Sequence, residues 1–387
     1  MSGARLGRAG ARSALALAFV ALAAVAGAQD AAPTPPPPPP PPPPAAEPKF
    51  AVNGFASAAY VHNFNDPLSE MNQFRVYDFD AGELKLDVAE LVLQRTTPVK
   101  NSFGFRIDAT AGQSIPKIAA ASGLFRDSET GEAEDFDLQQ IYVTWVSPLG
   151  RGLRIDAGKF ITIAGLEVIE GYDGWNDEYS RGFLFGYAQP GTHTGLKVSY
   201  PVSDQVTLTA MAVQGWDNFT DNNDGKTFGA QVAWVPSGKV TLYLNYIGGP
   251  ERADSDDARH LFDTVLVLKP SPTVTIGFNG DVATEKNGAG PGQDASWKGF
   301  AAYLRFGLGS RMALNLRGGL FDDEDGARTG VAQKLSEGTA TLEYKIGHGF
   351  LVRGEVRHDH SDKAVFDKDG GLDRNQTTLA GNLIFAY

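Results

Sequence analysis

The 387-residue chain contains no cysteine, which argues against a disulfide scaffold. Long apolar runs are also missing, because outside the extreme N-terminus no stretch reaches the roughly 18 residues that a helical membrane span needs. Positive charge is scarce: 34 lysines and arginines stand against 46 aspartates and glutamates, so the formal net charge is -12. This acidic balance argues against a nucleic-acid partner.

The first 28 residues have the features of an export signal. Three arginines precede the short apolar run 13–25, and small residues at 26–28 offer a cleavage site after Ala28. The alternative is an N-terminal anchor helix, but the apolar run is short and the cleavage site follows it directly. We therefore expect 1–28 to be a signal peptide and the mature protein to act outside the cytoplasm.

A proline-rich segment follows the signal, and "PTPPPPPPPPPPAAEP" (33–48) contains ten consecutive prolines. Such a run forms a polyproline II helix with about 3.1 Å per residue, which makes a stiff spacer of roughly 30 Å. We expect 29–49 to be a periplasmic linker. It is either a plain solvated connection or an extension that holds something off the membrane or touches the cell wall.

Apolar and polar residues alternate along the whole remainder, 50–387. In "KGFAAYLRFGLGSRMALNLRGGLF" (298–321), Phe300 and Leu304 share one parity and Arg305 has the other. Alternation of this kind is typical of β-strands, and no capped amphipathic helix interrupts it. The pattern predicts about sixteen strands: 50–64, 82–95, 99–112, 134–147, 152–163, 192–201, 204–215, 227–236, 239–248, 258–269, 272–284, 296–308, 311–321, 335–346, 349–360 and 374–387.

The connections between these strands alternate between tight and long without a break. Seven are tight and rich in proline, glycine and serine, which favour reverse turns. The long ones lie near 65–81, 113–133, 164–191, 216–226, 249–257, 285–295, 322–334 and 361–373. A soluble sandwich has no reason to keep all its long loops at one end, whereas an outer-membrane barrel does. The sequence therefore predicts an all-β fold, a closed antiparallel transmembrane barrel with short periplasmic turns and long extracellular loops.

Aromatic residues of the apolar parity lie near the ends of the predicted strands, as in the interfacial belts of membrane barrels. They are Trp145, Tyr200, Trp234, Tyr344 and Tyr387 near short turns or the terminus, and Tyr246 near a long loop. The final "TLAGNLIFAY" resembles the C-terminal signal read by the barrel-assembly machinery of Gram-negative outer membranes. That machinery, outer-membrane lipid and lipopolysaccharide are therefore expected partners.

Charged residues of the other parity would line the lumen of such a barrel. They are Arg106, Asp108, Arg154, Asp156, Lys197, Arg305, Arg317, Glu343, Lys345, Arg353, Glu355 and Arg357. Mixed charges of both signs fit a porin lumen, which selects polar solutes by size and charge. For each residue the alternative is a salt bridge that stiffens the wall, and the preference for cations or anions stays open.

The longest predicted loop, 164–191, is rich in aromatic residues, which is unusual for a fully solvated loop. We hypothesise that it folds into the barrel and narrows the pore. The residues then expected near the constriction are Asp173, Trp175, Asp177, Glu178 and Arg181. The alternative is an outer lid packed on neighbouring loops.

Several short motifs fail as chemical signatures. "DNNDG" (221–225) lacks the spacing of a calcium-binding EF-hand, and "HDH" (358–360) has too few further ligands for a metal. "GAGPG" (288–292) has no lysine or following helix, and a G-x-S-x-G nucleophile motif is absent. We therefore expect no enzyme activity, no cofactor and no metal.

Several stretches resemble the OmpL-like β-barrel porin-2 family. They are "GFASAAYVHNFN" (54–65), "NQFRVYDFD" (72–80), "LQQIYVTW" (138–145), "AGKFITIAGLEVIEGYDGWNDEYSRGFLFGYAQPGTHTGLKVSYPV" (157–202), "GWDNFTDNNDGKTFGAQ" (215–231) and "NYIGGPE" (245–251). The resemblance implies a Gram-negative outer-membrane porin but assigns no ligand residues.

The expected function is therefore passive diffusion of small hydrophilic solutes and ions through a water-filled barrel. The alternative is a non-conducting barrel that anchors surface loops for adhesion or envelope contact. A homotrimer is expected only by analogy with other porins.

Overall fold

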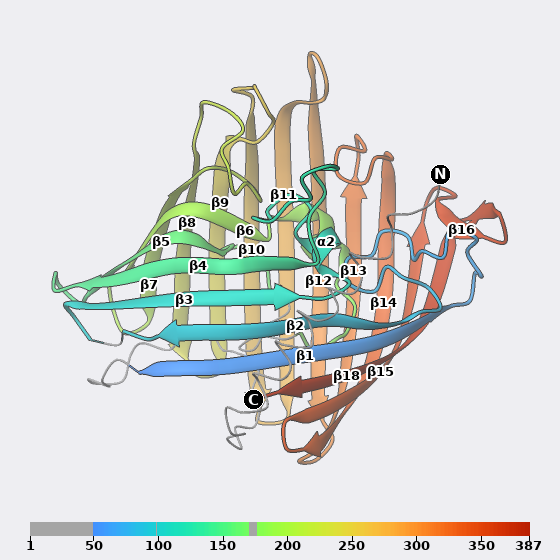
Figure 1. The fold of residues 1–387 in the computed structure, drawn as a ribbon, viewed down its shortest axis with the longest axis horizontal. Coiled ribbons are helices and arrows are strands. Elements are labelled where there is room, and N and C mark those ends of the chain that lie inside the picture. Colours follow the sequence, from blue (N-terminus) through green and yellow to red (C-terminus); the bar gives the residue numbers. More distant parts are fainter. Residues whose placement is uncertain (1–48, 98, 170–175) are drawn as a thin grey trace.

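The protein is one closed antiparallel β-barrel (Figure 1). The computed structural model describes residues 49–97, 99–169 and 176–387, so the predicted signal peptide and nearly all of the predicted linker lie outside the described residues. Each strand pairs with its neighbours in the chain, and the first strand closes on the last. The predicted fold class and the strand number of sixteen are confirmed.

The barrel strands are β1 Phe50–Asn63, β2 Leu84–Arg95, β3 Ser102–Ala111, β4 Phe136–Ser147, β5 Leu153–Ile161, β6 Thr192–Pro201, β7 Val206–Val213, β8 Thr227–Ser237, β9 Val240–Pro250, β10 Ala258–Ser271, β11 Val274–Gly290, β12 Gln293–Gly307, β13 Met312–Asp323, β14 Gln333–Gly347, β15 Phe350–Ser361 and β18 Asn375–Ala386. A separate hairpin, β16 Phe366–Lys368 and β17 Gly371–Asp373, lies within the last long loop. The described helices are the α-helix α2 Ile115–Ile118 and the π-helix η1 Leu184–Ala188. Neither described helix has the length and apolarity that a membrane crossing requires.

One predicted loop is a strand extension instead. The sequence predicts a connection at 285–295, but β11 continues to Gly290 and β12 resumes at Gln293. Asn287 has a φ of 53°, and its side-chain oxygen accepts a hydrogen bond from the Gly292 amide at 2.7 Å. Because this part of the hairpin carries few apolar side chains, alternation of hydrophobicity gave no sign of the strands there.

The two faces of the barrel have opposite chemistry. Along β13, Asn315 and Arg317 are buried, whereas the apolar Leu320 is exposed. The same holds on β15, where Arg357 is buried and Val356 is exposed. A soluble sheet would bury its apolar face, so an apolar exterior around a charged interior is the pattern of a barrel in lipid.

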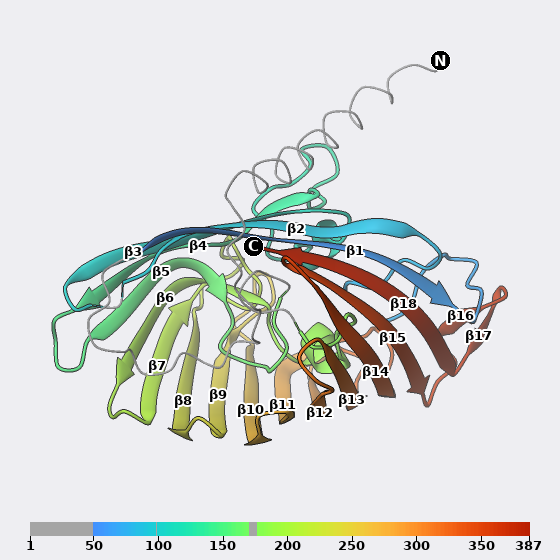
Figure 2. The same ribbon diagram turned by 90° about the horizontal axis from the view of Figure 1, so that it is seen from below.

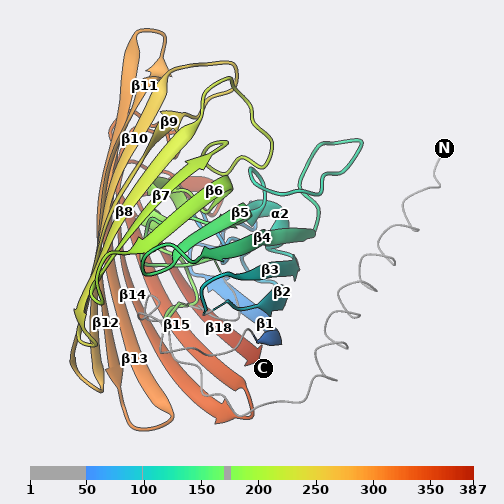
Figure 3. The same cartoon turned by 90° about the vertical axis from the view of Figure 1, so that its left-hand side faces the viewer.

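The barrel closes at the rim that carries the tight turns. The end of β18 lies against the start of β1 (Figure 3), where Ala386 is the register partner of Phe55. The Tyr387 amide donates to the Gly54 oxygen at 3.1 Å, and the Gly54 amide donates back at 3.2 Å. The described chain thus begins and ends at one rim.

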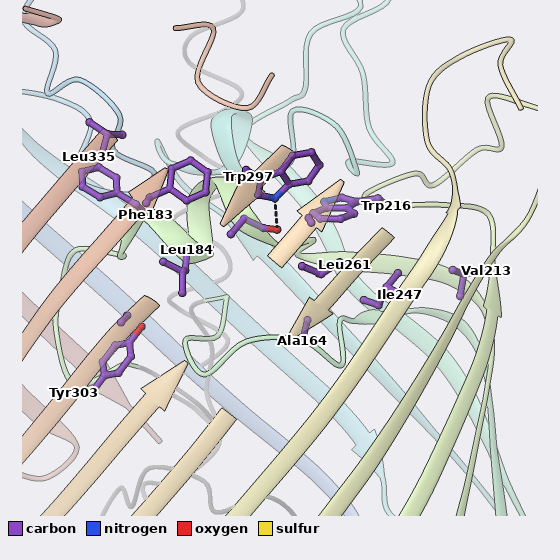
Figure 4. Packing of buried hydrophobic residues seen from close by; sticks show 14 of the residues in the cluster. Ala164, Phe183, Leu184, Val213, Trp216, Ile247, Leu261, Trp297, Tyr303 and Leu335 are labelled. Carbon is purple, nitrogen blue, oxygen red and sulfur yellow. Dashed lines mark hydrogen bonds between the residues drawn. The ribbon is translucent and has the colours of Figure 1, made fainter. Parts of the chain in front are cut away.

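The connection between β5 and β6, residues 162–191, is here called the inner loop. Its helix η1 lies within the ring of strands (Figure 2) and contacts β11, β12 and β13. Phe183 and Leu184 belong to a buried apolar cluster with Trp297 and Tyr303, whose side chains point inward from β12 (Figure 4). Part of the barrel interior is therefore filled by the chain itself.

Candidate functional site: the lumen and its inner loop

Both ends of the inner loop are fixed to the barrel wall. At its start, the Gly165 amide donates to Asp263 Oδ1 at 3.2 Å and the Leu166 amide donates to Asn279 Oδ1 at 3.3 Å. At its end, Trp297 Nε1 donates to the Ala188 oxygen at 3.1 Å (Figure 4). The strands that hold these two ends are β10, β11 and β12, far from the loop's own flanking strands around the barrel.

Arginines of β13 and β15 donate hydrogen bonds to the middle of the loop. Arg317 Nη1 donates to Glu167 Oε1 at 2.9 Å and to the Ser180 oxygen at 2.6 Å. Arg353 Nη1 donates to the Glu178 oxygen at 3.3 Å. Guanidinium groups suit this task because their planar fork satisfies several acceptors at once.

Acidic and amide side chains of the wall complete the attachment. Glu355 accepts the Tyr179 amide at 2.7 Å and the Ser180 amide at 3.0 Å. Arg305 Nη1 pairs with Asp177 Oδ1 at 2.8 Å, and Asn315 Nδ2 donates to the Asp177 oxygen at 2.9 Å. The structure thus brings Asp177 into the barrel as part of a continuous network.

The structure describes three of the five predicted constriction residues. Asp177, Glu178 and Arg181 lie inside the barrel, whereas Asp173 and Trp175 lie outside the described residues. The Arg181 guanidinium lies 4.4 Å from the centre of the Tyr77 ring, which comes from the loop between β1 and β2. The inner loop is therefore held from two sides, by the wall and by this first loop.

Burial shifts the acid–base behaviour of the inner loop. Burial raises the pKa of Glu178 to about 8; the nearby Arg317 opposes the shift, and the Asp177 carboxylate adds to it. Burial also raises the pKa of Asp177, although Arg305 opposes this shift. The inner loop consequently carries less negative charge at neutral pH than its composition suggests.

A different wall, made by β3–β6, carries cations whose carboxylate partners are hidden. Arg106 Nε lies 2.8 Å from Asp108 Oδ1, and Arg154 Nε lies 2.9 Å from Asp156 Oδ1. Lys197 Nζ lies 3.8 Å from Asp156 Oδ2. The side chains of Arg154, Lys197 and Arg106 are 42%, 18% and 12% exposed, whereas those of Asp108 and Asp156 are 1% and 3% exposed.

Neutral groups hold these carboxylates in the wall. Gln140 Nε2 donates to Asp108 Oδ2, and Thr144 Oγ1 donates to Asp156 Oδ1 at 2.6 Å. Lys197 Nζ lies 4.4 Å from the centre of the Phe160 ring, a cation–π distance. Each pair thus presents its positive end to the interior and keeps its negative end within the wall. We call Arg106, Arg154 and Lys197 the basic wall.

The predicted lumen residues therefore occupy two settings. One group is buried beneath the inner loop and holds it or supports its anchors: Arg317, Glu343, Arg353, Glu355 and Arg357. The other group is more open: Arg106, Arg154 and Lys197 on the basic wall, Arg305 beside Asp177, and Lys345 near a tight turn. Asp108 and Asp156 are buried partners of the basic wall.

Sequence reasoning missed several residues of the network. Glu337 receives hydrogen bonds from Arg317, and Glu167 bridges Arg317 to the Tyr303 hydroxyl at 3.2 Å. Glu337 shares the inward parity of Glu343 and was within reach of the same argument. Glu167 was not, because no periodicity describes a loop.

The side chains of the "HDH" motif (358–360) make contacts within the barrel wall. His358 and His360 point outward and meet Thr377 and Asn375, whereas Asp359 points inward. Asp359 pairs with Arg357 at 2.7 Å. Across residues 49–97, 99–169 and 176–387, no group of three or more histidine or acidic side chains could hold a metal ion.

Comparison with known proteins agrees with this architecture. A family model described as "Putative beta-barrel porin-2, OmpL-like" matches residues 49–387. No curated protein matches the chain.

Many solved structures share the fold, including the following three. The anion-selective porin from Comamonas acidovorans is 12% identical with a TM-score of 0.58, covering 88% of this chain and 100% of that one. The outer membrane channel DcaP of Acinetobacter baumannii is 10% identical with a TM-score of 0.58, covering 88% and 97%. Outer-membrane expressed OmpT of Vibrio cholerae is 10% identical with a TM-score of 0.59, covering 89% and 99%. At these identities the likeness establishes the fold, and the family match establishes the kinship: the chain belongs to the OmpL-like β-barrel porin-2 family.

Proposed function

We propose that the protein is an outer-membrane porin through which small hydrophilic solutes and ions diffuse passively, with a preference for anions. The observation that carries the preference is the unequal exposure of the ion pairs on the basic wall. Arg154 is 42% exposed while its partner Asp156 is 3% exposed. A solute passing this wall meets cationic groups first.

The physical argument concerns distance and dielectric. At physiological salt the screening length is about 8 Å, so a solute responds mainly to the charges it passes closely. A buried carboxylate lowers the field of its partner but does not contact the solute. Asp177 of the inner loop forms one partly exposed pair with Arg305 of β12, and this pair is close to neutral. The basic wall therefore sets the sign of the local potential.

The finer expectations from the sequence belong to this proposal. Residues 1–28 act as the export signal and 29–49 as a periplasmic spacer. The barrel-assembly machinery inserts the barrel next to lipopolysaccharide, and the barrels associate as trimers. The apolar exterior and the family membership support the membrane setting.

A second function has its own support. The inner loop fills part of the interior with buried contacts, and its helix packs in an apolar cluster with Trp297. A barrel plugged in this way would conduct little and would act by presenting its outer loops for adhesion or envelope contact.

Conductance of the refolded mature protein in a planar bilayer separates the two functions. Stable steps under a salt gradient, with a reversal potential of the anion-selective sign, are the expected result. A folded barrel without steps would favour the anchoring function. A cation-selective reversal potential would refute the anion preference while leaving the pore in place.

Substitutions on the basic wall test whether its three residues cause the preference for anions. The triple variant R106Q/R154Q/K197Q should shift the reversal potential towards cation selectivity. The control is K298Q, because Lys298 is 62% exposed on the outer face of β12 and does not face the lumen. Equal shifts in both variants would show that the basic wall does not set selectivity.

A further inference from the structure

Two aspartates face one another where the inner loop begins. Asp263 on β10 and Asp281 on β11 are register partners with side chains on the inner face of the barrel. Both are buried. Side chains directly opposite on neighbouring strands have Cβ atoms about 4.5–5.5 Å apart, and like charges there repel. Two ionised carboxylates in a buried position of this kind would destabilise the wall.

The hydrogen bonds of the two carboxyl groups are unequal. Asp263 accepts the amides of Asn245, Asn279 and Gly165, the last at 3.2 Å. Among the described residues, no N–H or O–H group donates a hydrogen bond to either oxygen of Asp281, and both oxygens are buried. Asp263 is thus equipped to be an anion, and Asp281 is not.

No cation balances the pair within the described part of the chain. On β9 the register partner of Asp263 is Asn245, and on β12 the register partner of Asp281 is Gly299. The space beside Gly299 is occupied by Leu184 of η1, whose Cδ1 lies 2.7 Å from where a Cβ would be.

Other charged groups nearby are already paired. Arg259 on β10 binds Glu285 of β11 at 2.9 Å. Glu167, which follows the loop start, binds Arg317 at 2.9 Å. Among the described residues no ion pair includes Asp263 or Asp281.

We propose that Asp263 and Asp281 form a proton-binding site that fastens the start of the inner loop. One proton resides on the Asp281 carboxyl group and is donated to the Asp263 carboxylate. Asp263 remains the anion that holds Asn245, Asn279 and the Gly165 amide. When hydroxide removes the proton, water forms and a second carboxylate remains, so the two groups repel and the Gly165 attachment loosens.

A metal ion explains the geometry less well. Calcium takes six to eight oxygen ligands. Asn245 and Asn279 turn their N–H groups towards Asp263, while the Asn279 oxygen accepts the Leu166 amide and the Asn245 oxygen accepts Gln231. The amide oxygens are therefore occupied, and only Asp281 would remain to offer free oxygens.

Infrared spectroscopy of the folded mature barrel tests the site without requiring an open pore. The wild type should show the carbonyl stretch of a protonated carboxylic acid at neutral pH, and D281N should lose that intensity. The variant E178Q shows how much of the carbonyl band comes from Glu178. The control is D256N, which removes a carboxyl group from an exposed outer loop. An unchanged band in D281N would overturn the proposal, as would loss of the wild-type band on adding calcium.

Amide hydrogen exchange at Gly165 and Leu166 tests the fastening. In the wild type, exchange should accelerate as pH rises beyond the intrinsic base-catalysed increase, and D281N should remove this extra acceleration. D263N should expose both amides at every pH, because the single amide oxygen of an asparagine cannot replace a carboxylate that accepts three hydrogen bonds. If D281N fails to assemble, D281S, which keeps a donor without a titrating group, takes its place. Extra acceleration that persists in the substituted barrel would refute the proposal, whatever the conductance result.

Discussion

Removing Arg317 should release the middle of the inner loop. Arg317 is buried and donates to the Ser180 oxygen at 2.6 Å, to Ser180 Oγ at 3.0 Å and to Glu167 at 2.9 Å. The substitution R317M keeps much of the side-chain volume but removes every one of these hydrogen bonds. It also leaves Glu167 and Glu337 without their main cation.

The magnitude follows from burial. Removing one partner of a buried ion pair costs about 3–5 kcal/mol. Arg357 Nε remains 3.3 Å from Glu337, so we expect the lower end of that range. Since about 1.4 kcal/mol corresponds to tenfold, the detached population of the loop should rise roughly 100-fold.

Hydrogen exchange at residues 179–182, measured by mass spectrometry, reports this population directly. The control is R151M, because Arg151 forms an exposed ion pair with Asp204 near a tight turn, worth about 0–1 kcal/mol. R317M should also make single-channel current noisier. If protection at 179–182 falls no more in R317M than in R151M, the wall does not hold the loop as argued.

Four further predictions concern charge, lipid and backbone. Because Glu178 has a pKa of about 8, its carboxyl group ionises as pH rises through that value. The preference of the pore for anions should therefore fall above pH 8 in the wild type but not in E178Q. Identical reversal potentials of the two proteins above pH 8 would contradict this. The same shift means that the folded protein binds the extra proton between about pH 4.5 and 8, so stability against urea should fall as pH rises across that window, and an opposite slope would count against it. V356R places a charge on the exposed outer face of β15. If that face meets lipid, the substitution should lower the free energy of unfolding by about 2–4 kcal/mol, as measured by urea unfolding in bilayers with V356A as the control. Gly349 has a φ of 82°, and a Cβ added there would lie 2.2 Å from the Ala386 oxygen. The substitution G349A should therefore destabilise the barrel by about 1–3 kcal/mol, whereas G354A, at a position with open space around it, should not. Equal melting temperatures of the two variants would refute the strain at Gly349.

Alternation was enough to predict the sides of the strands. Arg305 and Arg317 were assigned to the inner face from parity alone, and both point inward. Strand boundaries followed for the same reason, because one face must meet an apolar medium. Parity failed at 285–295, where both faces are polar.

Alternation could not predict how deeply each inward-facing side chain is buried. Arg154 and Arg317 have the same parity signature, yet one is 42% exposed and the other is fully buried beneath the inner loop. The difference depends on Glu167 and Ser180, which are more than a hundred residues from Arg317 in the chain. Contacts between a loop and a distant strand leave no local period in the sequence.

The position of the inner loop in the chain also imposes an order of events on assembly. The loop is synthesised between β5 and β6, but its anchors come from β10–β13 and β15. Such contacts of high sequence separation form late in folding. A barrel that has not yet received its last strands therefore has no wall on which to seat the loop, and the interior takes its final shape only when the C-terminal third of the chain is in place.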